Sequence, residues 1–176
     1  MKTILIILVV FISPGWLASQ GYIPDIELRN LDGEIYPSVQ LLHADQPCIL
    51  VFWKSYSTTC CNNLENMQSA WISQLKDKGV KLIAICVDCR GTWSYLKPFV
   101  QGKAWDFDVY IDVNGDFKRA MGVTDAPYTL LLDKNQKVVC RSAGYCSGNE
   151  EFVCQKILHC LEDAEGGTGF QANSKY

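Results

Sequence analysis

The sequence predicts a single α/β domain, with a central mixed sheet flanked by helices. Two apolar runs of strand length, Cys48–Trp53 and residues 80–88, are typical of strands buried on both faces of a sheet. The segment between them has apolar residues three and four positions apart, as an amphipathic helix does. Farther along, residues 128–142 contain two apolar stretches around a Lys-Asn-Gln turn, which is the pattern of an antiparallel hairpin.

The composition is that of one globular domain with a sizeable core. The chain has 176 residues, of which 48% are hydrophobic and 11% aromatic. The net charge is −3 and basic residues form no run, so the composition gives no sign of nucleic acid or an anionic membrane surface as a partner.

Residues 1–20 have the features of a secretory signal peptide. Lys2 supplies the positive charge, the apolar run ILIILVVFI follows, and SPG and ASQG form the cleavage region. The apolar run is too short to span a bilayer comfortably, although an uncleaved anchor is the alternative. We therefore expect cleavage near Gln20 and a periplasmic or secreted domain over residues 21–163, with no membrane attachment afterwards.

The first half of this domain alternates strands and helices. Two short strands are expected around the Asp32-Gly33 turn, ahead of the buried strand Cys48–Trp53. An apolar stripe then predicts a helix over residues 60–78, with Gly79 as its C-cap. The stripe consists of Leu64, Met67, Trp71 and Leu75. A right-handed crossover places the next strand, residues 80–88, parallel to the first and beside it.

The second half is expected to complete the sheet and cover it. A short helix is predicted in residues 92–100, a third strand in 107–112, and one or two helical turns in 113–123. After the hairpin, the pattern predicts a closing helix over residues 149–163. Its apolar face consists of Phe152, Val153, Ile157 and Leu161. Residues 164–176 are polar and rich in glycine, and a flexible tail is expected there.

The carboxyl ends of the two buried parallel strands meet at one edge of the sheet, where α/β proteins usually carry their chemistry. Ser57 is placed there to cap the first long helix, and Cys60 falls in its first turn. Free N–H groups and partial positive charge at a helix start stabilise a thiolate. We therefore expect Cys60 to be the most reactive thiol. The alternative is that Ser57 is only a cap and Cys60 a small buried residue.

Cys61 and Cys89 are the candidates for a second thiol. Neighbouring strands lie about 4.8 Å apart, so Cys89, just past the second strand, comes within disulfide range of Cys60 or Cys61. A permanent structural disulfide is the alternative for this pair. The chain has nine cysteines, and in an exported protein this number implies disulfides with at least one cysteine left over. Cys146 and Cys154 are a further candidate disulfide.

Metal binding is not expected. The CVDC segment, residues 86–89, has zinc-ligand spacing, but no second ligand pair follows at zinc-finger distance, and the two histidines stand apart. Cys48 and Cys86 are expected to be core residues of their strands. No cofactor is expected either, because sulfur would carry the chemistry.

Three segments in this order resemble the thioredoxin fold, and within it the exported TlpA/ResA-like thiol-disulfide oxidoreductases and the AhpC/TSA redoxins. VFWKSYSTTC is similar to their strand-to-helix active-site segment, LIAICVD to the next strand, and GVTDAPYTLLLDKNQKVV to the cis-proline and hairpin. The resemblance implies a thioredoxin-like fold, with Pro127 as a cis-proline beside which a substrate strand pairs. Trp53 and Tyr56 are expected to line the core or the rim of the site.

The sequence departs from the family pattern at the thiols. Ser57 stands where the family has its first, attacking cysteine, so the motif is S-x-x-C. Val51 replaces the buried acid of thioredoxin, and Thr58-Thr59 replace the Gly-Pro pair. These departures favour an atypical or monothiol reaction at Cys60.

The function expected from these residues is thiol–disulfide exchange through Cys60, with protein thiols or disulfides, or a reductant protein, as partners. One alternative is an antioxidant thiol peroxidase, because peroxiredoxins carry T-x-x-C at the equivalent place. Against it, Trp53 stands where they have a proline, and no arginine matches theirs in position, although Arg90 is near that edge. The other alternative is a disulfide-rich exported module that kept the fold without the chemistry.

Overall fold

The structure is a computed structural model that describes residues 22–42, 46–88, 93–146 and 148–166. The predicted signal peptide lies outside these residues, as do Cys89, Arg90 and residues 167–176. None of the helices in the described ranges combines the length and apolar character needed to span a bilayer.

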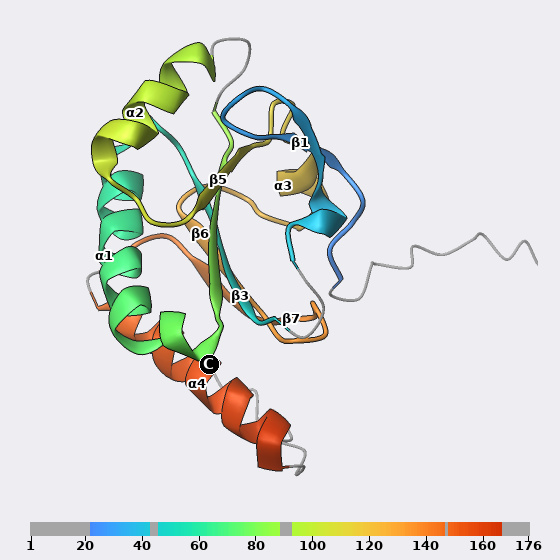
Figure 1. The fold of residues 1–176 in the computed structure, drawn as a ribbon, viewed down its shortest axis with the longest axis vertical. Helices are drawn as coiled ribbons and strands as arrows, with labels where there is room; N and C mark the ends of the chain where they lie inside the picture. Colours follow the sequence, from blue (N-terminus) through green and yellow to red (C-terminus); the bar gives the residue numbers. More distant parts are fainter. Residues whose placement is uncertain (1–21, 43–45, 89–92, 147, 167–176) are drawn as a thin grey trace, which may run out of the picture.

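Seven strands form one mixed sheet in the order β2-β1-β5-β4-β3-β6-β7 (Figure 1). They are β1 (Glu27–Arg29), β2 (Ile35–Pro37), β3 (Cys48–Trp53), β4 (Lys81–Cys86), β5 (Asp108–Ile111), β6 (Tyr128–Leu132) and β7 (Val138–Ala143). β3 and β4 are parallel neighbours, and their register runs from the Cys48–Lys81 pair to the Trp53–Cys86 pair. β6 and β7 are antiparallel. Both the parallel pair and the hairpin predicted from the sequence are confirmed.

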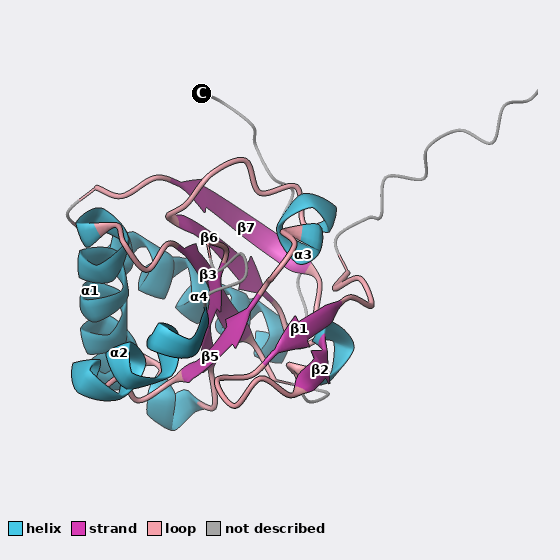
Figure 2. Cartoon of the chain, turned by 90° about the horizontal axis from the view of Figure 1, so that it is seen from above, coloured by secondary structure: helices cyan, strands magenta, loops and turns pink. Residues whose placement is uncertain are grey.

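The helices cover both faces of this sheet. They are α1 (Thr58–Gln74), α2 (Leu96–Lys103), α3 (Asp116–Ala120) and α4 (Asn149–Gly166), with short 3-10 turns η1 (Ser38–Gln40), η2 (Lys76–Lys78) and η3 (Trp93–Tyr95). Figure 2 shows α1 and α2 on one face and α3 on the other. α4 packs on the same face as α1, since Val153 and Ile157 join the apolar cluster of that face.

The central strand β3 is buried on both of its faces, as its continuous apolar sequence predicts. Ile49, Val51 and Trp53 point toward α1, whereas Cys48, Leu50 and Phe52 point toward α3. All six residues are at most 1% exposed. Period-two alternation is absent from the sequence because both faces are apolar. Cys48, and Cys86 of β4, are core residues as expected.

The element ends differ from the prediction in small ways. α1 begins at Thr58, directly after its cap, and it ends at Gln74 because Leu75 leaves helical geometry at φ −126°. The stretch before Gly79 is the 3-10 turn η2, and Gly79 closes it with a left-handed φ of 76°. β4 stops at Cys86, so Asp88 lies beyond the strand. α4 continues past residue 163 to Gly166.

Candidate functional site

The first turn of α1 is capped by Ser57. Ser57 has extended geometry (φ −95°, ψ 111°), and its Oγ accepts a hydrogen bond from the Cys60 N–H at 3.3 Å. Its carbonyl oxygen accepts from the Cys61 N–H at 3.0 Å. This geometry confirms the predicted cap and places Cys60 in the first turn, where backbone N–H groups concentrate positive charge.

Both cysteines of this turn face the protein interior. Cys60 has no exposed surface and Cys61 is 7% exposed, and both belong to the apolar cluster between the sheet and α1. The Cys61 thiol donates to the Ser55 carbonyl at a sulfur–oxygen distance of 3.9 Å. Burial raises the pKa of Cys61, nearby Glu65 and Asp88 raise it further, and Lys103 opposes them. Cys61 is therefore held as a neutral thiol at neutral pH.

The peptide bond between Ala126 and Pro127 is cis, as predicted for Pro127. The loop that carries it is tied to the end of β3, because Asp125 Oδ1 accepts from Lys54 Nζ at 2.5 Å. The same oxygen accepts from the Ala126 N–H at 2.9 Å. The pKa of Asp125 is lowered chiefly by its bond with Lys54, and the pKa of Lys54 is raised chiefly by the same bond.

A second carboxylate joins the ends of β3 and β4. Asp88 Oδ2 accepts from both the backbone N–H and the hydroxyl of Ser55, at 2.9 and 2.8 Å. The Cys86 thiol donates to Asp88 Oδ1 at 2.8 Å. The Ser55 hydroxyl also shares a hydrogen bond with the Tyr95 hydroxyl from η3. Asp88 thus connects two neighbouring strand ends directly beneath the start of α1.

The model of the family described as AhpC/TSA matches residues 20–141 of the chain. The chain belongs to the AhpC/TSA family. The matched segment spans β1 to β7 and therefore contains the capped helix start, the end of β4 and the cis-proline loop.

Relatives of this AhpC/TSA protein include thioredoxin-like proteins of known structure. The chain is 26% identical over 149 residues to a thiol-disulfide oxidoreductase ResA from Bacillus thuringiensis, covering 77% of this chain and 83% of the relative. It is 31% identical to a thioredoxin-like protein from Porphyromonas gingivalis, with a TM-score of 0.70 over 81% of this chain and 95% of that one. A putative DsbE-type thiol:disulfide interchange protein from Chlorobium tepidum gives 25% identity and a TM-score of 0.68, covering 81% of this chain and 98% of that one. The expected thioredoxin-like fold is confirmed.

The structure brings most predicted site residues of this AhpC/TSA protein to one edge of the sheet. Ser57, Cys60 and Cys61 lie in or beside the first turn of α1. Tyr56, just before the cap, is 75% exposed. Trp53 is fully buried instead, stacked on Phe99 with ring centroids 6.2 Å apart, so it supports the edge from within the core.

The structure does not confirm the two cysteine pairings predicted from the sequence. Cys60 and Cys61 are free thiols in the structure, so a permanent disulfide to either of them is not formed. Cys89 lies outside the described residues, and its role as a reactive partner of Cys60 or Cys61 stays a prediction. The expected disulfide between Cys146 and Cys154 is wrong in the structure, where both are free thiols. Cys154 is buried on the inner face of α4, whereas Cys146 is exposed in the loop before this helix, so the two thiols occupy opposite environments.

The Asp88–Ser55 network was missed by the sequence-based prediction. The only sequence signal for it is the presence of polar residues after both buried strands, Ser55 after β3 and Asp88 after β4. No group of three or more His, Cys, Asp or Glu side chains in the described part of the chain is arranged to hold a metal ion.

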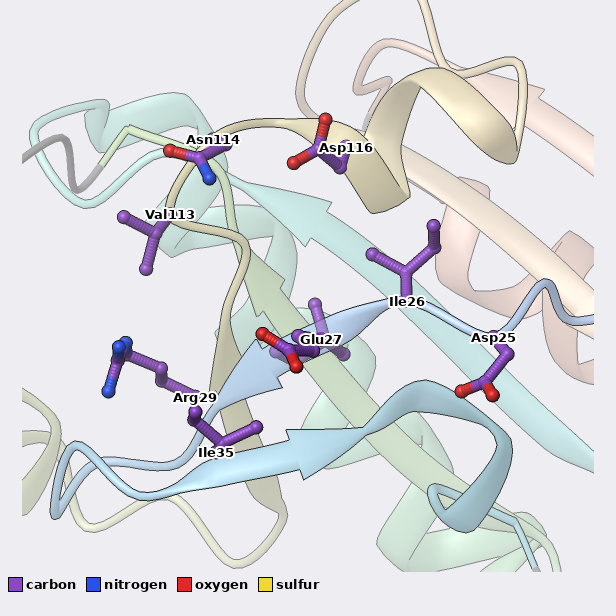
Figure 3. A pocket seen from close by; sticks show the side chains of 9 residues that line it. Asp25, Ile26, Glu27, Arg29, Ile35, Val113, Asn114 and Asp116 are labelled. Atoms are coloured by element: carbon purple, nitrogen blue, oxygen red, sulfur yellow. The ribbon is translucent and has the colours of Figure 1, made fainter.

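A separate pocket of about 330 Å³ lies on the β1 side of the sheet (Figure 3). It is lined by residues of β1 and β2 and by the segment after β5, among them Glu27, Ile35 and Asn114. None of the predicted thiol-site residues lines it. The thiol site therefore lies at an edge of the sheet and not in this pocket.

Proposed function

We propose that this protein carries out thiol–disulfide exchange outside the cytoplasm, through Cys60, on protein thiols or disulfides. The family membership supports this class of chemistry, since the ResA relative is named as a thiol-disulfide oxidoreductase. The predicted signal peptide supports a periplasmic or secreted location for the domain of residues 21–163.

The observation that carries the proposal is the contact between Ser57 and Cys60. Ser57 Oγ accepts from the Cys60 N–H at 3.3 Å and so fixes the helix start with Cys60 in its first turn. A thiolate in this turn is stabilised by the helix dipole and by N–H groups that have no partner inside the helix. Among the described residues, the Cys60 sulfur has no hydrogen-bond acceptor in the structure, whereas the Cys61 proton is held by Ser55.

The reaction begins with the Cys60 thiolate. It attacks one sulfur of a substrate disulfide, the substrate S–S bond breaks, and a mixed disulfide with Cys60 forms. The departing sulfur takes up a proton and leaves as a thiol. Because Ser57 has no sulfur, the step that resolves this mixed disulfide needs a thiol from elsewhere, such as Cys61 or Cys89, or from a reductant protein.

Substrate access is set by the exposed residues around this buried thiol. Tyr56, Thr58 and Thr59 are exposed above Cys60, so the first turn of α1 must shift to admit a disulfide. The backbone at the cis-proline loop, just before β6, is where we expect a substrate strand to pair. Its N–H at Ala126 is already bonded to Asp125, which leaves the Ala126 carbonyl for the substrate. Tyr56 would contact the substrate at the rim, with Trp53 supporting it from below.

The test offers the purified protein a peptide disulfide and, separately, hydrogen peroxide, with Cys60→Ser as the variant. We expect a mixed disulfide with the peptide in the wild type and its loss in Cys60→Ser. Cys48→Ser is the matched control, since Cys48 is an equally buried thiol on the opposite face of β3. Peroxide-dependent sulfenic acid at Cys60 without disulfide exchange would instead identify a thiol peroxidase. If the protein carries out neither reaction, it is a non-catalytic module.

A further inference from the structure

Two thiols and a carboxylate form one hydrogen-bonded chain at the ends of β3 and β4. Cys86 donates to Asp88, Asp88 accepts twice from Ser55, and the Ser55 carbonyl accepts from Cys61. The Asp88 carboxylate is thereby fixed through both of its oxygens. A carboxylate that receives a thiol proton at 2.8 Å is placed to accept it when that thiol ionises.

The position of Cys86 suits a partner for the first turn of α1. Cys86 is the last residue of β4 and pairs in register with Trp53, whose chain leads through Ser55 to the helix start. It has no exposed surface, and it shares the apolar cluster beneath α1 with Cys60 and Cys61. Because the Cys86 thiol is buried, solvent and bulky disulfides cannot reach it directly. A mixed disulfide on Cys60 would have its Cys60 sulfur in the same buried layer as Cys86.

We propose that Cys86 is the thiol that resolves the mixed disulfide on Cys60, and that Asp88 accepts its proton. This inference rests on the proposed function, whose monothiol helix start leaves the resolving step open. Cys61 is less suited to the role, because a disulfide between adjacent residues is strained and its thiol proton is held by the Ser55 carbonyl.

Asp88 takes the Cys86 proton, and the Cys86 thiolate attacks the Cys60 sulfur of the mixed disulfide. A Cys60–Cys86 disulfide forms, the bond to the substrate breaks, and the substrate sulfur leaves as a thiol with the proton from Asp88. Over both steps the protein dithiol loses two electrons and two protons, and the substrate disulfide gains them as two thiols.

Other titratable groups surround this series of hydrogen-bonded side chains. Tyr95 from η3 meets Ser55, and the Lys103–Glu65 ion pair, at 2.8 Å, joins α2 to α1 beside Cys61. The pH dependence of the resolving step therefore has to be compared between variants and not interpreted from a single profile.

The test follows the two steps separately in acid-quenched mass spectra of the purified protein reacting with a peptide disulfide. The wild type should accumulate a Cys60–Cys86 disulfide. Cys86→Ser and Cys86→Ala should stop at the mixed disulfide on Cys60, while Cys48→Ser, with a buried thiol on the other face, should behave as the wild type. Asp88→Asn should slow release of the second thiol by about 100-fold and shift its pH dependence, as expected for a lost proton acceptor.

The outcomes separate the inference from the function on which it rests. If both Cys86 variants release the second thiol at the wild-type rate, or if the wild type forms a Cys60 disulfide with Cys61 or Cys89, the inference is overturned while the proposed function stands. If no mixed disulfide forms on Cys60 in any protein, both fail. The wild-type disulfide map does not depend on whether a variant folds, so it decides the pairing by itself.

Discussion

Asp125 and Lys54 join the cis-proline loop to the end of the central strand. The Asp125 carboxylate receives the Lys54 ammonium at 2.5 Å and the N–H of Ala126, the residue before the cis peptide bond, at 2.9 Å. Lys54 directly follows β3 and precedes the loop to α1. This contact therefore sets the distance between the loop proposed to bind substrate and the helix start proposed to carry the thiol.

Removing the Asp125 side chain should lower the rate of disulfide exchange with little loss of stability. Asp125→Ala removes both hydrogen bonds, and we expect about fivefold slower exchange, the equivalent of roughly 1 kcal/mol of lost positioning. The two side chains are 26% and 71% exposed, so the pair contributes at most about 1 kcal/mol to unfolding. Asp106→Asn, which removes the exposed ion pair with Lys76, is the matched control and should leave exchange unchanged. Equal rates in Asp125→Ala and the control would refute the positioning role.

The pH dependence of this contact follows from the two pKa shifts. Because the pKa of Asp125 is lower in the folded protein, its contribution is present above the unfolded value near 3.9 and is lost as the pH falls through the folded value. The pKa of Lys54 is raised, so its contribution is lost only as the pH rises through that folded value. Asp125→Ala should therefore change unfolding at neutral pH and have no effect at the acidic end of a pH series of urea denaturation curves.

Replacing the helix cap should weaken both the helix and its thiol. Ser57→Ala removes the acceptor for the Cys60 N–H, and we expect a loss of about 1 kcal/mol in the free energy of unfolding measured in urea. Alkylation of Cys60 should slow as well. Ser57→Thr keeps the hydroxyl and should retain most of both. Ser73→Ala, near the other end of α1, removes an exposed hydroxyl that donates to the Ala70 carbonyl and should stay within about 0.5 kcal/mol of the wild type.

Placing a second sulfur at the cap should convert the site into a dithiol. Ser57→Cys creates C-x-x-C at the helix start, where the new thiol can resolve the mixed disulfide on Cys60. We expect a large gain in the reduction of a protein disulfide by this variant, measured with a thiol reductant in excess. An unchanged rate, with no mixed disulfide detected on Cys60, would show that the helix start does not support redox chemistry.

The buried thiol of α4 predicts a loss of stability at alkaline pH. Burial raises the pKa of Cys154 to about 11, with Glu151 and Glu150 contributing. The cysteine thiol of an unfolded chain ionises near pH 8.5. Between about pH 8.5 and about 11 the folded protein keeps the Cys154 proton that the unfolded chain has lost. The free energy of unfolding therefore falls as the pH rises through this range. In Cys154→Ala this fall should be smaller than in the wild type. Cys146→Ala, which removes an exposed thiol, should leave it unchanged.

Much of the fold could be predicted from the sequence, because local patterns determine it. The apolar run of Cys48–Trp53 identified the central strand, and its six residues are buried on both faces. Ser57 was identified as a cap because only its side chain and the spacing to Cys60 matter there. Pro127 was expected to be cis because its segment resembles the cis-proline loop of the thioredoxin fold.

The site contacts between distant segments could not be predicted in the same way. The link between Asp88 and Ser55 depends on how two loops from neighbouring strands place their side chains. The burial of Cys60 and Cys61 together depends on how closely the first turn of α1 packs on the sheet. Sequence spacing places Cys60 and Cys61 at the helix start but does not determine the depth at which they lie.

The most direct test of the account is to identify which cysteine first forms a mixed disulfide with a peptide disulfide. The protein is mixed with an equimolar peptide disulfide, quenched in acid at early times, and mapped by mass spectrometry. We predict that Cys60 is modified first, before the adjacent Cys61, whose pKa is raised by burial, and before the exposed Cys146. First modification at Cys61 or Cys146, with Cys60 unmodified, would contradict it.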